Sequence, residues 1–255
     1  MFIIIRYFVL LVIIALSLGC HSKQSSISTE KNRTMIQIPI RKPQLEKDWY
    51  NVAFLIMDGV YNTELTAPYD IFHHTRFREG IKPMNVFTVA NTLDPVISFE
   101  GIRLLPDFNY LEDVLPLIDI LVVPSAEHHL DTDLLDEAMI AFVQQTAENA
   151  QFITSHCDGA FVLAKAGILD TVVSTTFPAD VPVYKQMFPQ LDIRENVLFV
   201  HDGKYITSAG GVRSFEAALY LTDLLYGVAI SQRLAQGLVM EWDADAVTKL
   251  VVREQ

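Results

Sequence analysis

Cysteine is scarce in this chain of 255 residues, which contains only two, Cys20 and Cys157. Because Cys20 ends an N-terminal leader, the folded part keeps one thiol and cannot hold an intramolecular disulfide framework. Basic residues are also few: 19 Lys and Arg stand against 31 Asp and Glu, which gives a net charge of −12. This shortage argues against a nucleic-acid partner, since binding to phosphates requires clustered Lys and Arg.

The first twenty residues have the pattern of a targeting segment. Residues 7–18 form an unbroken apolar run that is too short to span a bilayer comfortably. The run ends in Leu-Ser-Leu-Gly-Cys at residues 16–20, which resembles a bacterial lipobox. Cleavage before Cys20 and lipidation of its thiol would anchor the protein to a membrane. An ordinary secretory signal and an uncleaved anchor are the alternatives.

These features predict a lipoprotein signal peptide at residues 1–19 and a location in the bacterial cell envelope. The residue after Cys20 is His21 and not the Asp of a retention signal, so we expect the outer membrane, facing the periplasm, in a host with two membranes. Residues 20–47 are polar and rich in Ser and Lys, which predicts a flexible tether. Residues 48–255 suit one domain, without an internal repeat or a second boundary.

The stretch at residues 151–169 predicts a nucleophile elbow. A strand-like run ends at His156, and an Ala- and Leu-rich helical run begins after Asp158-Gly159, with Cys157 at the corner between them. In this geometry the corner side chain projects from the carboxyl edge of the sheet. Free amide hydrogens and the helix dipole would favour its thiolate form. The alternative is a buried, inert cysteine that ends a core strand.

The rest of the domain alternates strands and helices, which predicts an α/β fold with a mainly parallel sheet. Glu64 opens a helix just past the first strand, at the edge where open α/β sheets bind ligands, although it could simply be a favourable first-turn acid. We expect a helix at 131–147 capped by Asp131 or Thr132, and a hairpin turn at Asp202-Gly203. The other expected elements are strands at 49–57, 84–90 and 118–124, a hairpin within 96–105, and helices at 180–188, 213–226 and 229–240.

From residue 50 to residue 240, the chain resembles the ThiJ/PfpI superfamily of class I glutamine-amidotransferase-like proteins. The matching motifs are Glu-Leu-Thr-Ala-Pro at 64–68, Val-Val-Pro at 122–124, Cys-Asp-Gly-Ala-Phe-Val-Leu-Ala-Lys-Ala-Gly-Ile-Leu at 157–169, Ser-Thr-Thr-Phe-Pro at 174–178, and Asp-Gly-Lys-Tyr-Ile-Thr-Ser-Ala-Gly-Gly at 202–211. The resemblance is strongest to the branch of isonitrile hydratases and AraC-type sensor domains. It implies a flavodoxin-like three-layer sandwich, a homodimer, and a protonated Glu64 that hydrogen-bonds Cys157.

Three departures from the family pattern affect the expected chemistry. Phe177 replaces the histidine that many relatives carry, and Asp158 follows the nucleophile where the protease-like branch has His. Ser125-Ala126 follows Pro124 in place of the usual Gly-Gly, although the two backbone amides could still line an oxyanion pocket. Peptidase activity is therefore not expected.

Two nearby histidines, His128 and His129, could replace the missing base, although we expect at least one of them to be a solvated loop residue. His156 is expected to pack beneath the sheet, because neighbouring strand side chains point to opposite faces. No cofactor is expected, and no spaced ligand motif supports a metal site at Glu127, His128 and Cys157.

Two functions remain open from the sequence. In the first, Cys157 adds to an electrophilic carbon of a small molecule while Glu64 or Asp158 handles protons, as in hydratase or lyase chemistry that resembles isonitrile hydratase. In the second, the same pocket binds a ligand or senses oxidants without catalysis. An open polar pocket would favour the enzyme, and a pocket plugged by Phe177 and Tyr61 would favour the binding module.

Overall fold

A computed structural model describes residues 42–253 of the chain. The predicted signal peptide, the lipidation site at Cys20 and most of the tether lie outside these residues. Within residues 42–253, no helix is long and apolar enough to cross a membrane.

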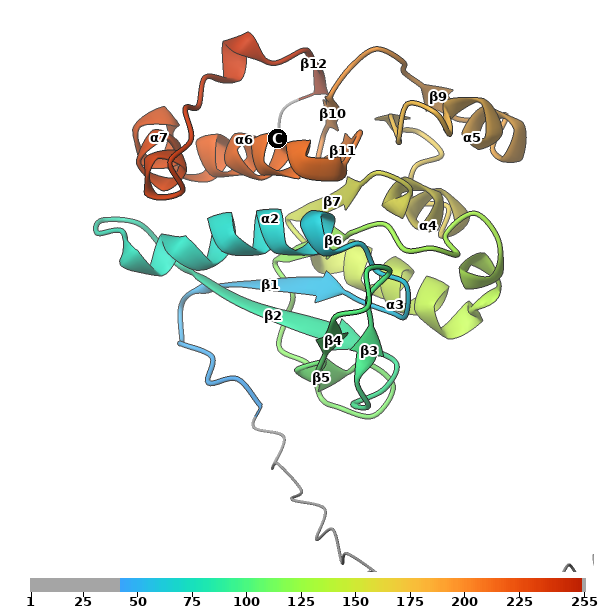
Figure 1. The fold of residues 1–255 in the computed structure, drawn as a ribbon, viewed down its shortest axis with the longest axis horizontal. Helices are drawn as coiled ribbons and strands as arrows, with labels where there is room; N and C mark the ends of the chain where they lie inside the picture. Colours follow the sequence, from blue (N-terminus) through green and yellow to red (C-terminus); the bar gives the residue numbers. More distant parts are fainter. Residues whose placement is uncertain (1–41, 254–255) are drawn as a thin grey trace, which may run out of the picture. The chain divides into compact units, whose positions relative to one another are not determined.

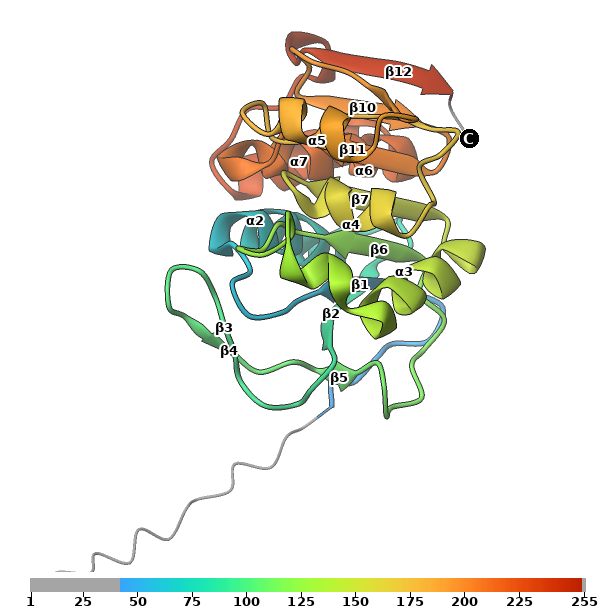
Figure 2. The same ribbon diagram turned by 90° about the vertical axis from the view of Figure 1, so that its right-hand side faces the viewer.

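The domain is built on one eight-stranded sheet, with the strand order β12-β10-β11-β7-β6-β1-β2-β5 (Figure 2). The pairs in this sheet are parallel except for the hairpin of β10 and β11. The mainly parallel α/β sheet predicted from the sequence is confirmed. Its strands are β1 (Tyr50–Leu55), β2 (Met84–Ala90), β5 (Phe108–Asn109), β6 (Ile120–Val123), β7 (Phe152–His156), β10 (Phe199–Asp202), β11 (Tyr205–Ser208) and β12 (Lys249–Arg253).

Helices cover both faces of the sheet (Figure 1). One face carries α2 (Asn62–His73), α6 (Ser214–Tyr226) and α7 (Val228–Gly237), and the other carries α3 (Glu137–Asn149) and α4 (Gly159–Lys165). Two small units lie beside the sheet: the β3–β4 hairpin, and α5 with β8 and β9. Their bounds are β3 (Val96–Ile97), β4 (Arg103–Leu104), α5 (Val181–Met187), β8 (Val173–Ser174) and β9 (Asp192–Ile193).

Strand β1 is apolar almost throughout because it is buried on both faces of the sheet. Val52 and Phe54 belong to the core cluster beneath α2 and α6, while Ala53 and Leu55 belong to the cluster beneath α3 and α4. Successive side chains of a strand point to opposite faces, so a strand covered on both sides needs apolar residues at every position. The sandwich of three layers follows from this pattern.

Two local predictions were wrong, and one strand was not predicted. Helix α3 begins later than expected, because Asp136 caps it by accepting hydrogen bonds from the Ala138 and Met139 amides, while residues 132–135 form a 3-10 turn. In the β10–β11 hairpin, Asp202 pairs with Tyr205, so the turn residues are Gly203 and Lys204. The tail, which carried no clear pattern, forms β12, a parallel partner of β10.

Gly159 sets the close approach of α4 to β6. A Cβ atom at this position would lie 2.1 Å from the Val123 carbonyl oxygen, which is backbone and cannot move aside cheaply. We therefore expect Gly159→Ala to lower the free energy of unfolding by about 1–3 kcal/mol, as overpacking does. Gly237→Ala is the control, since its Cβ would meet only the flexible Arg78 side chain. Equal urea midpoints for the two variants would contradict this account.

Candidate active site

Cys157 occupies the corner between β7 and α4, as predicted. Its φ of 51° lies in the left-handed region, which is uncommon for a residue other than glycine and marks local strain. The backbone is held there by a hydrogen bond from the Cys157 amide to the Ser208 carbonyl, 2.9 Å long. The side chain is 8% exposed, so the thiol lies just below the surface at the carboxyl edge of the sheet.

Glu64 reaches the same point from α2. The side chain is 5% exposed, and both carboxyl oxygens accept backbone hydrogen bonds: Oε2 from the Ser125 amide at 3.0 Å and Oε1 from the Gly211 amide at 2.9 Å. A Cβ atom at Gly210 would lie 2.4 Å from Cys157 Cβ and 2.7 Å from Glu64 Oε1. The structure thus brings Glu64 and Cys157 together against Gly210.

The loop after β6 is arranged differently from the predicted oxyanion pocket. The Ser125 amide donates to Glu64, and the Ala126 amide donates to His129 Nδ1 at 3.2 Å. Neither amide is therefore free to bind a substrate oxygen. The Ser125 hydroxyl is buried, and no atom of the described part of the chain lies in good hydrogen-bonding geometry to it. It lies close enough to Cys157 to lower the pKa of the thiol.

Asp158 also lies beside the thiol. Its Oδ2 atom lies 3.7 Å from Cys157 Sγ, within reach of a weak hydrogen bond from the thiol. Its Oδ1 atom lies 3.0 Å from the Thr176 hydroxyl, which comes from the loop after β8. Two carboxyl groups, those of Glu64 and Asp158, therefore lie close to the Cys157 side chain.

These surroundings raise the pKa of the Cys157 thiol. Burial is the largest cause, followed by the charges of Glu64 and Asp158. Burial also raises the pKa of Glu64, against the hydrogen bonds from the Gly211 and Ser125 amides, which lower it. From the sequence we expected the following helix to stabilise the thiolate and so to lower the pKa of Cys157, which is the opposite of the shift found here. At neutral pH the resting site holds a thiol.

A model of the DJ-1/PfpI family matches residues 50–223. The chain belongs to the DJ-1/PfpI family. It is 30% identical to an isonitrile hydratase from Pseudomonas putida over 184 residues, which cover 71% of this chain and 74% of the relative. Two solved structures have the same fold. One is a ThiJ/PfpI family protein from Pseudomonas syringae, with 21% identity, a TM-score of 0.64, and coverage of 80% of this chain and 84% of that one. The other is an AraC family transcriptional regulator from Pseudomonas putida, with 20% identity, a TM-score of 0.63, and coverage of 74% and 99%.

The histidines of this DJ-1/PfpI protein do not form a base beside the thiol. His128 is exposed, and its Nδ1 atom lies 3.2 Å from Asp131 Oδ1. Burial lowers the pKa of His129 and of His156 to about 3, which leaves both rings neutral at pH 7. His156 is buried as predicted, with Nδ1 2.9 Å from the Ser208 hydroxyl.

Phe177 and Tyr61, the two aromatic residues that could have plugged the site, are each at least partly exposed. Phe177 is 40% exposed, so its ring does not fill a buried space. Tyr61 stacks on Phe99 of the β3–β4 unit, with ring centroids 4.6 Å apart. Tyr61 lies near the thiol all the same, since burial and then the charges of Cys157 and Asp158 raise its pKa.

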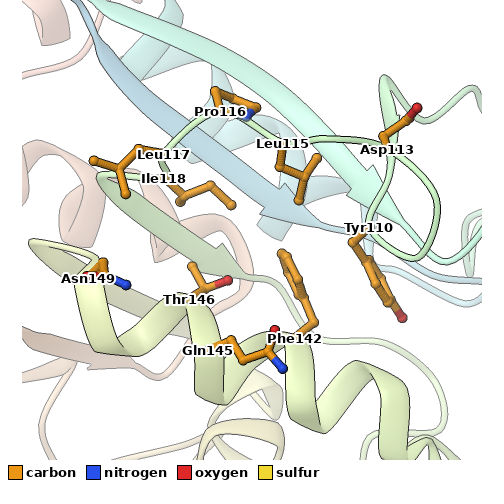
Figure 3. Close-up of a pocket in the computed structure, with 10 residues that line it drawn as sticks. All are labelled: Tyr110, Asp113, Leu115, Pro116, Leu117, Ile118, Phe142, Gln145, Thr146 and Asn149. Carbon is orange, nitrogen blue, oxygen red and sulfur yellow. The ribbon is translucent and has the colours of Figure 1, made fainter.

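Two cavities lie elsewhere in the domain. A cavity of about 480 Å³ separates α3 from the loop after β5 (Figure 3). Another, of about 360 Å³, lies next to His128 and Asp58. Cys157 lines neither of them. Among residues 42–253, no three His, Cys, Asp or Glu side chains are grouped so that they could hold a metal ion.

Sequence reasoning missed three contributors to the site. Thr176 contacts Asp158, the Gly211 amide binds Glu64, and Gly210 leaves space for both Glu64 and Cys157. The Gly210-Gly211 pair could be recognised in the sequence as a turn. Glycine is also the residue expected where the backbone approaches other atoms too closely to leave room for a side chain. Nothing local to Thr176 indicated its partner.

Proposed function

We propose that this protein hydrates a small isonitrile to the corresponding formamide through Cys157. The observation that carries the proposal is the buried Cys157 thiol, which has the carboxyl groups of both Asp158 and Glu64 close to it. The similarity to an isonitrile hydratase supports the same substrate class. Members of the DJ-1/PfpI family commonly bind small molecules and often form dimers, and we propose a homodimer here as well.

The first stage suits a thiol better than a free thiolate. An isonitrile, R–N≡C, receives both new bonds on one carbon: sulfur forms the S–C bond, and the same carbon gains a hydrogen. The product is a thioimidate, Cys157–S–CH=N–R, which contains every atom of the thiol and the isonitrile. Glu64 packs with Cys157 against Gly210, so it is placed to take the thiol proton and deliver it to the carbon.

In the second stage, water hydrolyses the thioimidate. The water oxygen bonds to the carbon, the nitrogen gains a proton, and the product is Cys157–S–CH(OH)–NH–R. The C–S bond then breaks, the hydroxyl proton returns to sulfur, and the formamide R–NH–CHO leaves. The Ser125 hydroxyl, buried beside the sulfur, can hold the attacking water. The sum is one isonitrile and one water converted to one formamide.

The test is a direct assay of the purified full chain with methyl, cyclohexyl and benzyl isonitrile. Formamide is followed by proton NMR, with buffer and heat-unfolded protein as blanks. We expect catalytic turnover of at least one of the three compounds. Formamide at the level of the blanks with all three would reject the proposal.

The second candidate function is a binding or sensing module. The low exposure of Cys157 and the raised pKa of its thiol favour it, because both slow attack on a bulky substrate. The assay separates the two candidates: isonitriles that bind and shift the thermal midpoint without being converted indicate a module. Oxidant sensing has its own readout, the rate of Cys157 sulfinate formation in dilute peroxide.

We also propose that the protein is a lipoprotein, anchored to the outer membrane in a host with two membranes. The support is the lipobox-like sequence that ends at Cys20. Cells fed an alkyne fatty acid should label the wild type and the Cys157→Ala control equally, and the label should be absent from Cys20→Ala. A label that persists in Cys20→Ala would remove the proposed anchor.

A further inference from the structure

Two stretches of chain that carry the site begin at one pair of residues, His156 and Ser208. His156 is the last residue of β7 and Ser208 the last of β11, and the two are partners in the parallel pairing of these strands. The branch after β7 begins with Cys157. The branch after β11 contains the Gly211 amide, which donates to Glu64 Oε1 at 2.9 Å. One branch therefore holds the sulfur, and the other holds the carboxyl group beside it.

The side chains of this pair are hydrogen-bonded to each other. Both are buried, and His156 Nδ1 lies 2.9 Å from the Ser208 hydroxyl oxygen. That hydroxyl donates its one hydrogen to the Ser155 carbonyl oxygen at 3.2 Å, so it can only accept from His156. Burial lowers the pKa of His156 to about 3, which leaves a neutral ring with a single N–H group. The hydrogen of this ring is therefore on Nδ1.

The backbone of Ser208 holds the elbow directly. Its carbonyl oxygen accepts from the Cys157 amide at 2.9 Å, and the Thr176 hydroxyl donates to the Cys157 carbonyl oxygen at 3.0 Å. The φ of 51° at Cys157 is unfavourable for a residue with a side chain, and it persists only where neighbouring groups enforce it. The two branches also touch, since a Cβ atom at Gly210 would lie 2.4 Å from Cys157 Cβ. A shift of Ser208 would therefore move both branches.

We propose that His156 is a positioning residue, whose hydrogen bond to Ser208 fixes the point where the two branches part. It thereby holds the Cys157 sulfur and the Glu64 carboxyl group at a fixed separation. The effect on hydration rests on the proposed function, in which the thiol proton passes through Glu64. A misplacement of about 1 Å between reacting groups can slow a reaction about a hundredfold. His156 acts through Ser208 and is not itself a catalytic residue.

The test removes each half of this hydrogen bond in the full chain. His156→Leu removes the donor and keeps a side chain of similar bulk, and Ser208→Ala removes the acceptor. We expect each to lower kcat for the best isonitrile by roughly 10–100-fold, with KM nearly unchanged. His156→Asn places an amide nitrogen near the position of Nδ1, so it should stay within roughly threefold of the wild type. The double variant of Leu and Ala should be no slower than either single variant, because both changes break the same bond.

A second buried histidine provides the matched control. His201 Nδ1 lies 2.9 Å from the Tyr220 hydroxyl oxygen, and its strand, β10, is separated from β7 by β11. His201→Leu and His156→Leu should both lower the thermal midpoint, but only His156→Leu should slow hydration. An equal loss of kcat in the two variants would assign the effect to general destabilisation and overturn the proposal.

Alkylation of Cys157 by iodoacetamide at neutral pH gives a readout that does not depend on isonitriles. It is followed by mass spectrometry of the peptide that contains Cys157. A displaced corner is less buried and further from Glu64, so His156→Leu and Ser208→Ala should react roughly threefold faster or more. His156→Asn and His201→Leu should react at the wild-type rate.

The two readouts separate this proposal from the proposed function. Wild-type rates of both alkylation and hydration in His156→Leu would overturn the positioning role. Faster alkylation of His156→Leu and Ser208→Ala, in a protein whose wild type does not convert isonitriles, would support the positioning role and reject the proposed function. Wild-type turnover that neither substitution changes would do the reverse.

Discussion

The Cys157→Ser protein is expected to hydrate isonitriles at least roughly a thousandfold more slowly than the wild type, a loss of about 4 kcal/mol in transition-state stabilisation. Serine keeps the shape of the corner residue, so the fold should tolerate it. Its hydroxyl is a far weaker acid and nucleophile than a thiol. The site offers no histidine to activate it, since burial lowers the pKa of both His129 and His156 to about 3.

The measurement is kcat/KM for the best isonitrile, together with the thermal midpoint of each variant. Cys20→Ser is the matched control, because it removes the other thiol of the chain while leaving the site intact, and it should retain the wild-type rate. Cys157→Ala should be as inactive as Cys157→Ser. If Cys157→Ser keeps more than roughly a tenth of the wild-type rate, the reaction does not pass through the sulfur.

The central strands and the elbow could be predicted because their signals are local and strong. Strands β1 and β6 lie inside the fold, where both faces of each strand need apolar residues. The corner at Cys157 was visible from the change between a strand-like and a helical pattern. Placement of Glu64 beside Cys157 followed from a topological rule, that the carboxyl ends of parallel strands share one edge.

The elements that were missed depend on partners far away in the sequence. Strand β12 forms because Leu250 and Val251 pair with Val200 and His201 on β10, and the tail itself has no strong strand pattern. Strand β5 has two residues, Phe108 and Asn109, which pair with the end of β2. Strands this short are set by their neighbours and not by their own propensity.

The chemistry of the site was harder to predict than its location. The direction of the Cys157 pKa shift depends on how deeply the packed domain buries the thiol and on the carboxyl groups around it. The occupied amides of Ser125 and Ala126 depend on Glu64 and His129, which no local pattern pairs with them. Hydrogen-bond partners of this kind arise only when the loops at the sheet edge are folded.

The Glu64 carboxyl gives the second large expected effect, because both of its oxygens accept backbone hydrogen bonds. From the sequence, Glu64→Gln should keep much of the reactivity, since glutamine keeps a hydrogen-bond donor. The structure reverses this expectation. Glutamine has one acceptor oxygen, so its NH₂ group would face the amide of either Ser125 or Gly211, donor against donor, at a buried position.

We therefore expect Glu64→Gln and Glu64→Leu to lower kcat/KM for isonitriles by roughly 10²–10⁴, the size of a lost proton-transfer group. The reactivity of the thiol itself should change in the opposite direction. The charge of Glu64 raises the pKa of Cys157, so its removal should move the midpoint of iodoacetamide alkylation to lower pH. The measurement is alkylation against pH and isonitrile kinetics on the same preparations.

Glu127→Gln is the matched control, since Glu127 is an exposed acid on the loop after β6 and its loss should leave both hydration and alkylation near the wild-type values. Thermal midpoints identify a variant in which the site has collapsed. A folded Glu64→Gln protein that hydrates isonitriles at the wild-type rate would show that Glu64 carries no proton in the reaction. Faster alkylation together with slower hydration is the result that we expect. It would mean that Glu64 keeps the thiol protonated in the free protein and transfers its proton once the substrate is bound.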